Sequence, residues 1–151
     1  MNAIPDKYYE DFNVGDKFTT GERLVTREQI ATFAELSGDF NAIHTDEEYA
    51  KNNTPYGGII AHGGLIYSMG TGMFITSEAG APGLFLGLRQ DFKNATKPGD
   101  RIHLEIEVLS KRLTSRGDRG IVEYAVNTVN QDGVLLIEAV WKIMLDCKKA
   151  K

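Results

Sequence analysis

An apolar helical segment followed by a run of alternating strands is the feature that most limits how this chain can fold. The apolar members of the helical segment are Leu65, Ile66, Met69, Met73 and Phe74. Apolar side chains all round a helix indicate that it is buried on most sides. From residue 84 onward the period changes to two, which is typical of strands with one solvated face. This order predicts an α+β domain, with one central helix packed on a curved antiparallel sheet.

Local signals place the predicted elements along the chain. Residues 19–25 are predicted to be extended, and strands are expected at 85–92, 102–108, 122–128 and 134–145. The sequence at 130–133 is typical of a hairpin turn. Gly70 and Gly72 lie inside the central helix although glycine costs about 1 kcal/mol there relative to alanine. We therefore expect them to permit close approach of a sheet or a ligand.

Two helices are expected before the central one. A capping box at residues 26–29 opens the first helix, which ends at Ser37 and Gly38 because glycine is a common C-terminal stop. A second capping box at residues 45–48 opens a short helix that reaches Lys51. Asp39 and His44 therefore occupy the two ends of one loop between helices.

Composition limits the kinds of partner. The chain has 151 residues and a formal net charge of −4, so we expect a single domain over 1–151 and no nucleic-acid partner, because phosphate binding needs a basic field. No apolar run is long enough for a membrane span. Cys147 has no second cysteine to pair with and is expected to be an inert strand-end residue. The N-terminal segment lacks a secretory signal pattern, which favours a cytoplasmic protein.

The loop between the two helices carries the residues best suited to chemistry. A carboxylate at Asp39 and an imidazole at His44 can meet at one small molecule such as water, which is the minimum for general acid–base catalysis. Asn41 adds a polar group to the same loop. His62 is expected to hold a loop with its ring, whereas His103 lies at a solvated strand position and has no expected role. The backbone N–H groups of Gly63 and Gly64, at a helix N-terminus, are candidates for an oxyanion hole.

Two other interpretations of these residues compete with general acid–base catalysis. A metal site is possible because oxygen and nitrogen ligands are available at Asp39, Asn41, His44 and His62. Their spacing matches no familiar metal motif, so no metal is expected. A serine nucleophile is disfavoured, since there is no Gly-x-Ser-x-Gly elbow and Ser68 lies inside the central helix.

The same residues resemble a known family, the MaoC-like dehydratases, which include the R-specific enoyl-CoA hydratases. The matching positions are Asp39-x-Asn41-x-x-His44, then Asp46, Tyr49-Ala50 and Ala61-His62-Gly63, with family-like turns at 14–16 and 97–100. The resemblance implies a hot-dog fold, a homodimer or higher homo-oligomer with an acyl channel along the subunit interface, and catalysis by Asp39 and His44. It also implies that Ser68 helps to orient the aspartate.

The function that the resemblance implies is reversible hydration of a trans-2-enoyl thioester to an R-3-hydroxyacyl product, without a cofactor. Asp39 would accept a proton from the attacking water, and His44 would hold that water and supply a proton at C2. A hot-dog thioesterase and a non-catalytic acyl-binding module are the alternatives.

Several properties of the substrate stay open at this stage. Coenzyme A and acyl carrier protein both present an anionic carrier, and the candidates to contact it are the basic residues Arg89, Lys93, Lys97 and Arg112. Met69, Met73 and Phe74 are candidates to limit the depth of the acyl channel. Acyl length, the identity of the carrier and any assembly beyond a dimer are not determined by these residues.

Overall fold

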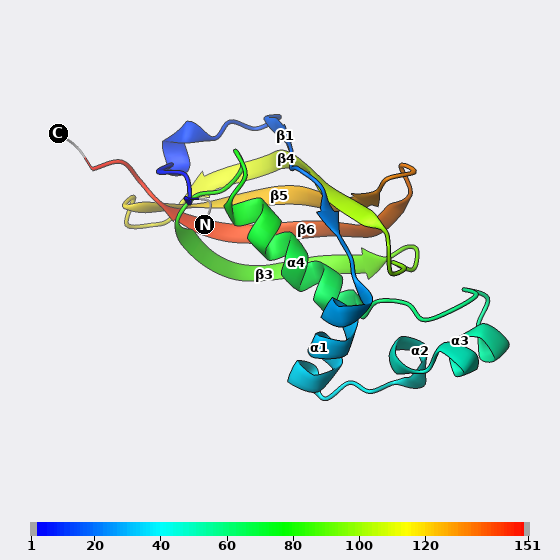
Figure 1. The fold of residues 1–151 in the computed structure, drawn as a ribbon. Helices are drawn as coiled ribbons and strands as arrows, with labels where there is room; N and C mark the ends of the chain where they lie inside the picture. The colour runs from blue at the N-terminus through cyan, green and yellow to red at the C-terminus, as the bar shows by residue number, and fades with distance from the viewer. Residues whose placement is uncertain (1–2, 150–151) are drawn as a thin grey trace.

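A computed structural model describes residues 3–149 and shows a six-stranded antiparallel sheet that curves around one helix, α4 (Figure 1). The predicted hot-dog fold is confirmed. The helices are η1 (Tyr9–Asp11), α1 (Arg27–Ser37), α2 (Ala42–Thr45), α3 (Glu47–Asn53) and α4 (Gly63–Ile75). The strands are β1 (Lys17–Thr19), β2 (Arg23–Leu24), β3 (Gly83–Phe92), β4 (Arg101–Leu113), β5 (Arg119–Asn130) and β6 (Leu135–Asp146). Within residues 3–149, no helix has the length and apolar character that a membrane crossing needs.

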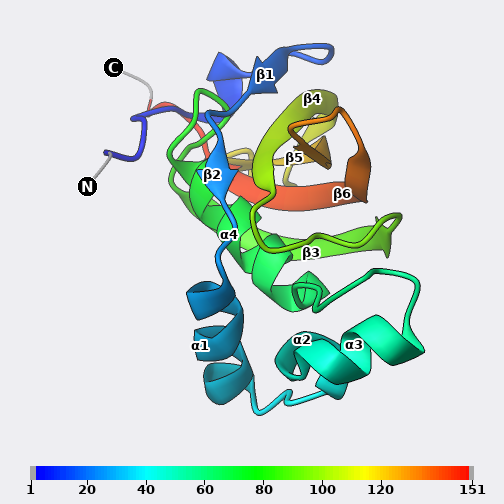
Figure 2. The same ribbon diagram turned by 45° about the vertical axis from the view of Figure 1, so that its right-hand side comes forward.

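The strands are arranged in the order β1-β4-β5-β6-β3, with β2 also beside β4. Only β4, β5 and β6 form the simple meander that the sequence predicts. The chain leaves β3 at one edge and crosses to β4, so that β3 pairs with β6 alone (Figure 2). One backbone edge of β3 is therefore free.

The core lies between α4 and the concave face of the sheet. The Phe74 ring contacts the rings of Tyr124 and Trp141, with centroids 5.1 and 5.3 Å away. Register shifts in β3, β4 and β5 supply the local bends that curve a sheet around a helix. Six residues of α4 are buried, as the sequence predicts.

The other side of α4 differs from the prediction. A stripe of small residues, Gly64, Ser68 and Gly72, is exposed along the helix. A Cβ atom at Gly70 would meet Leu104 at 3.7 Å, an ordinary contact, and one at Gly72 would meet nothing within 4 Å. The expected close approach of the sheet therefore does not require either glycine.

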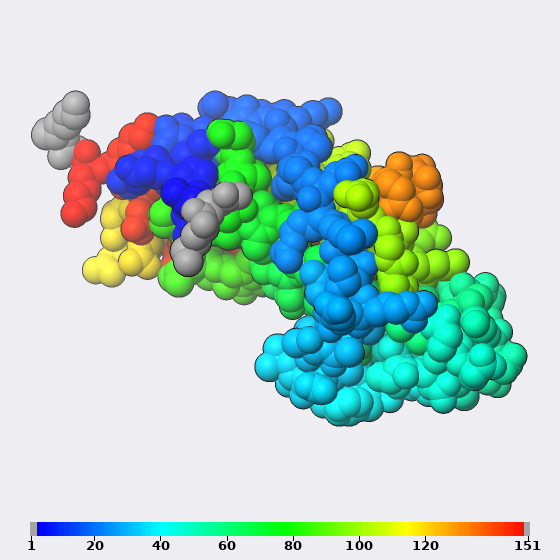
Figure 3. All heavy atoms as spheres, viewed as in Figure 1, coloured from blue at the N-terminus to red at the C-terminus, as the bar shows by residue number. Residues whose placement is uncertain are grey.

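Helices α1, α2 and α3 form a helical lobe (residues 27–53) that projects from one end of the sheet-and-helix body (Figures 1 and 3). Both ends of α1 are as predicted. The Gln29 N–H donates to Thr26 Oγ1 at 3.1 Å, and Gly38 ends the helix with φ of 78°. Glu47 joins the parts of the lobe, because its carboxylate accepts from Arg27 of α1 and from the N–H of Ile59.

The middle of the lobe corrects the sequence analysis in two ways. His44 lies inside α2, a short helix that was not expected, and not in an open loop. The residue that caps α3 is Asp46, whose side chain accepts from Tyr49 N–H, and not Thr45. Thr45 instead donates its hydroxyl to the carbonyl oxygens of Phe40 and Asn41. A helix of a single turn, such as α2, carries too little periodicity to be located from sequence.

Substitution of Gly38 tests whether the left-handed residue at the end of α1 stabilises the lobe. Its φ of 78° is unfavourable for residues with a Cβ, although a Cβ there would meet no neighbour. We expect Gly38→Ala to lower the free energy of unfolding by about 1 kcal/mol, and Gly38→Asn to lower it by less, measured by urea denaturation. Gly21→Ala is the control, since Gly21 lies in open space with an ordinary φ. Equal stability of the two alanine variants would contradict the role of the left-handed residue.

Candidate active site

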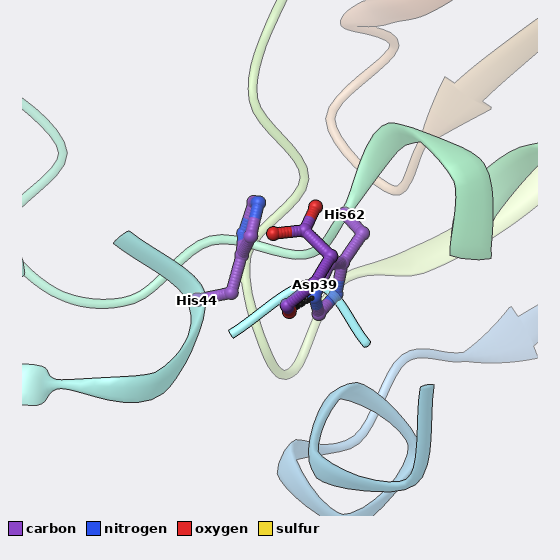
Figure 4. A group of neighbouring side chains, drawn as sticks. All are labelled: Asp39, His44 and His62. Atoms are coloured by element: carbon purple, nitrogen blue, oxygen red, sulfur yellow. Dashed lines mark hydrogen bonds between the residues drawn. The ribbon is translucent and has the colours of Figure 1, made fainter. Parts of the chain in front are cut away.

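Three polar side chains from different elements meet at the junction of the lobe and α4 (Figure 4). Asp39 follows α1, His44 lies on α2, and His62 is the residue just before α4. A carboxylate oxygen of Asp39 and one ring nitrogen of each histidine lie within 4.8 Å of one another. The predicted convergence of Asp39 and His44 is therefore present in the structure.

The hydrogen bonds of His44 decide which of its nitrogens carries a proton. The main-chain carbonyl of Ile60 lies 2.7 Å from His44 Nδ1. A carbonyl oxygen can only accept, so Nδ1 is protonated and Nε2 of the neutral ring carries the lone pair. Burial lowers the pKa of His44 below its ordinary value of 6.5, and neighbouring His62 lowers it further, while the Ile60 carbonyl and Asp39 act in the opposite direction. The ring is therefore neutral at pH 7.

His62 contacts both members of the pair. Its Nε2–H donates to the main-chain oxygen of Asp39 at 2.9 Å. Its ring stacks on that of His44 with centroids 3.9 Å apart, and the Phe33 ring packs edge-on against it. The predicted loop-holding role of His62 corresponds to these contacts.

Asp39 is exposed, and the bonds of its own loop are local. One carboxylate oxygen accepts from Asn41 N–H at 3.1 Å, and the Asp39 N–H donates to Ser37 Oγ at 3.2 Å. Asn41 in turn accepts at its side-chain oxygen from Ile43 N–H and so caps α2. In this structure Asn41 therefore orients the helix that carries His44.

A cavity of about 500 Å³ lies between this lobe and the loop that follows β3. Its walls include His44, Tyr56 and Ile60 from the lobe side, Gly63 and Gly64 from the start of α4, and Phe92 to Thr96 from the other side. The first N–H groups of a helix have no intrahelical acceptor, so those of Gly63 and Gly64 are available there. A Cβ at Gly63 would lie 2.4 Å from the Phe92 ring, which explains the glycine.

Other predicted residues lie elsewhere. Ser68 Oγ donates to Gly64 O at 2.8 Å, and none of the hydrogen bonds within residues 3–149 joins it to Asp39. Of the four basic residues considered for the carrier, Lys93 lines the cavity. Arg112 is paired with Ile121 at the far end of β4. Met69, Met73 and Phe74 are core residues that do not line the 500 Å³ cavity.

A metal ion fits this geometry poorly. Asp39, His44 and His62 are the right residue types, and each histidine donates one N–H to a carbonyl, as metal ligands often do. The rings are stacked, however, with only 29° between their planes. Lone pairs lie in the ring planes, so two nearly parallel rings do not direct them at one ion about 2.1 Å away. The arrangement suits proton transfer better.

Some groups that shape the site and its cavity were not identified from the sequence. The Ile60 carbonyl acts through the backbone and has no side-chain signal. Tyr56 and Phe92 lie far apart in the sequence, and only the fold brings them to one cavity. The Asn41 cap, in contrast, could have been found, because asparagine just before a helix is a common N-cap.

Comparisons with known proteins match this chain to one family. The family model described as MaoC like domain matches residues 11–130. An (R)-specific enoyl-CoA hydratase from Aeromonas caviae is 32% identical over 136 residues, which cover 89% of this chain and 97% of that protein.

Solved structures show the same fold. A MaoC-like dehydratase from Rhodospirillum rubrum has a TM-score of 0.84 and 29% identity, over 95% of this chain and 99% of that chain. A Mycobacterium tuberculosis protein described as a double hotdog fold has a TM-score of 0.83 at 19% identity, over 97% of this chain and 46% of that chain. From the family match, the relative and the shared fold, it follows that this chain belongs to the MaoC-like dehydratase family.

Proposed function

We propose that this protein catalyses reversible hydration of trans-2-enoyl thioesters to (R)-3-hydroxyacyl thioesters, with Asp39 and His44 as the catalytic residues. The observation that carries the proposal is that a carboxylate oxygen of Asp39 and a ring nitrogen of His44 lie within 4.8 Å of each other. A water that donates to two acceptors at about 2.8 Å spans roughly this distance. The relative from Aeromonas caviae, which is 32% identical, is named as an (R)-specific enoyl-CoA hydratase, and this name supports the same class of reaction for this chain.

The tautomer of His44 leads us to change the roles expected from the sequence, in which Asp39 takes the proton from water. Because Nε2 of the neutral ring has the lone pair, His44 is the group that takes a proton from water as the C3–O bond forms. The proton now on Nε2 then moves to C2, which restores the neutral ring. Asp39 accepts the second hydrogen bond of the water, and its charge stabilises the transient imidazolium. Water adds across the double bond and no proton is left over.

The start of α4 would stabilise the other end of the reaction. Negative charge develops on the thioester oxygen when C3 is attacked. The N–H groups of Gly63 and Gly64 line the same cavity as His44, and one such donor is worth about 3 kcal/mol in acyl-transfer enzymes. The scheme uses only side chains, backbone and water, so it needs no cofactor.

The two alternatives explain less of the geometry. A thioesterase needs a base beside the thioester carbonyl but not a carboxylate and an imidazole spaced for one water. A binding module needs neither, and it gives no reason to bury His44 with one nitrogen committed to Ile60 O.

We place the anionic carrier of the substrate, coenzyme A or acyl carrier protein, beside Lys93. This lysine is the basic residue among the walls of the cavity within the described chain. Its ammonium lies 3.4 Å from Glu138 and is exposed, so it can turn toward a phosphate.

A homodimer would cover the free edge of β3. Five large apolar side chains of this strand are exposed, which is unusual for an edge strand in a monomer: Leu84, Phe85, Leu86, Leu88 and Phe92. Pairing of β3 with β3 of a second copy gives a two-fold interface that hides this edge. The double hotdog protein, of which this chain matches 46%, supports two such units side by side.

Asp39→Asn tests the catalytic assignment. The amide keeps the shape but loses the charge that stabilises the imidazolium. We expect the hydration of crotonyl-CoA, followed by loss of conjugated-thioester absorbance, to fall by about 10²–10⁴-fold with the fold unchanged. Wild-type rates in this variant would refute the assignment. A thiol dye in the same assay reports thioesterase activity, which would favour the alternative.

The pH dependence follows from His44. Because the pKa of the neutral base is lowered below 6.5, the active form persists at pH 7 and is lost only as the pH falls through that lowered value. We expect kcat/KM to be flat near neutral pH and to decrease on the acid side, with a midpoint below 6.5. An acid limb centred above 7 would contradict a neutral His44.

Leu86→Lys tests the dimer. Lysine on an edge strand opposes pairing between sheets, so we expect this variant to be monomeric in light scattering after size exclusion, whereas the wild type is a dimer. Leu113→Lys is the control, because Leu113 is also exposed but ends β4, inside the sheet order. If both variants have the wild-type mass, the β3 edge is not the interface.

A further inference from the structure

The loop that carries Asp39 is exposed, and most of its hydrogen bonds join residues that are close in the sequence. Residues 35–41 are all exposed, and Phe40 has 60% of its surface exposed. The hydrogen bonds of this loop to Ser37, Gly38 and Asn41 are all between near neighbours in the chain. Thr45 Oγ1 also donates to the carbonyl oxygens of Phe40 and Asn41, and Ile43 N–H donates to Asn41 Oδ1, so these bonds tie the loop to α2 but not to α4.

One bond is different. The Nε2–H of His62 donates to the main-chain oxygen of Asp39 across 23 positions of sequence. Among the described residues, it is the hydrogen bond that ties Asp39 to a distant segment of the chain. His62 is itself rigid, with 2% of its surface exposed and Phe33 packed against its ring.

The other face of the same ring contacts the second catalytic residue. The His62 and His44 rings stack with centroids 3.9 Å apart. One side chain therefore touches Asp39 through its N–H and His44 through its face (Figure 4). His62 thus fixes the distance between the two groups that must share one water.

The second nitrogen of His62 argues against a purely structural role. Its Nδ1 is buried and has no hydrogen-bond partner within residues 3–149. A buried polar atom without a partner is destabilising. An aromatic hydrocarbon ring would fill the same space without that atom, so stability alone does not explain a histidine here.

We infer that His62 is a positioning residue, which sets the Asp39 carboxylate opposite His44 by donating to the Asp39 main-chain oxygen and stacking on the His44 ring. This inference rests on the proposed hydration. His62 itself touches neither water nor substrate in the scheme, and it acts through the placement of the other two.

Two substitutions separate the contacts. His62→Phe keeps a ring to stack on His44 but removes the donor to Asp39 O. His62→Gln keeps an amide N–H near the position of Nε2 but removes the ring. Displacement of a catalytic group by about 1 Å can cost about 10²-fold, so we expect His62→Phe to lower kcat for crotonyl-CoA by roughly 10–100-fold. We expect KM to stay within about twofold, because uniform substrate binding is unchanged.

The glutamine variant should recover part of the rate, at least about fivefold over His62→Phe, because it restores the donor. The melting temperature of His62→Phe should lie within about 4 °C of the wild type, since the lost hydrogen bond is offset by removal of the unpartnered Nδ1. His103→Gln is the matched control, since His103 lies on β4 away from the site and should leave kcat and KM at wild-type values.

A double-mutant cycle gives the strictest test. In an Asp39→Asn background there is no carboxylate to position, so His62→Phe should cost less than about twofold there. If the losses from His62→Phe and Asp39→Asn simply multiply, or if the phenylalanine and glutamine variants lose kcat equally, the inference is wrong. If His62→Phe does not fold, His62→Leu removes the same donor and is judged by the same criteria.

The failure of this inference differs from failure of the proposed function. A wild-type protein that hydrates no enoyl-CoA overturns the proposed reaction. A wild-type protein that hydrates crotonyl-CoA, with a His62→Phe variant of equal kcat, overturns only the role of His62.

Discussion

The hydrogen bond between His44 Nδ1 and the Ile60 carbonyl, 2.7 Å long, is the interaction on which the chemistry of this site depends. It selects the tautomer and so leaves the lone pair at Nε2. The same short segment also holds the walls of the cavity together, because Ile60 N–H donates to Ile43 O and Ala61 N–H donates to Thr96 O. The backbone between the lobe and α4 thus fixes both the protonation of the base and the shape of the space beside it.

In the proposed scheme, the catalytic side chains and the backbone N–H donors come from different parts of the structure. The side chains that we propose to be catalytic lie on the lobe, whereas α4, which begins with the N–H groups of Gly63 and Gly64, is anchored in the core through Phe74, Tyr124 and Trp141. A rigid helix can direct its N–H groups at a developing charge without reorganisation during the reaction. The lobe needs separate ties to α4, which the bonds of Ile60 and His62 supply.

The sequence predicted the long elements, and it predicted that Asp39 and His44 lie close together, for a physical reason. The strands and α4 have periodic patterns, and the caps at Thr26 and Gly38 are local signals. What it missed depends on tertiary structure or on short elements: the crossing of β3 to β6 and helix α2 around His44. The tautomer of His44, on which the proposed order of proton transfer depends, was also not predictable from the sequence, because it is set by a main-chain oxygen 16 residues away.

The donor set of this site, one carboxylate and two imidazoles, also occurs in metal centres, so residue type alone does not decide its chemistry. The stacked arrangement of the two histidine rings is the feature that argues against a metal ion here. Each histidine donates one N–H to a carbonyl oxygen, and the buried Nδ1 of His62 has no hydrogen-bond partner among the residues that the structure describes. His44 lines the cavity, and its Nε2 carries the imidazole lone pair that can take a proton. A single basic nitrogen beside a carboxylate can shuttle one proton between water and carbon, and the addition of water across a double bond requires no more than that.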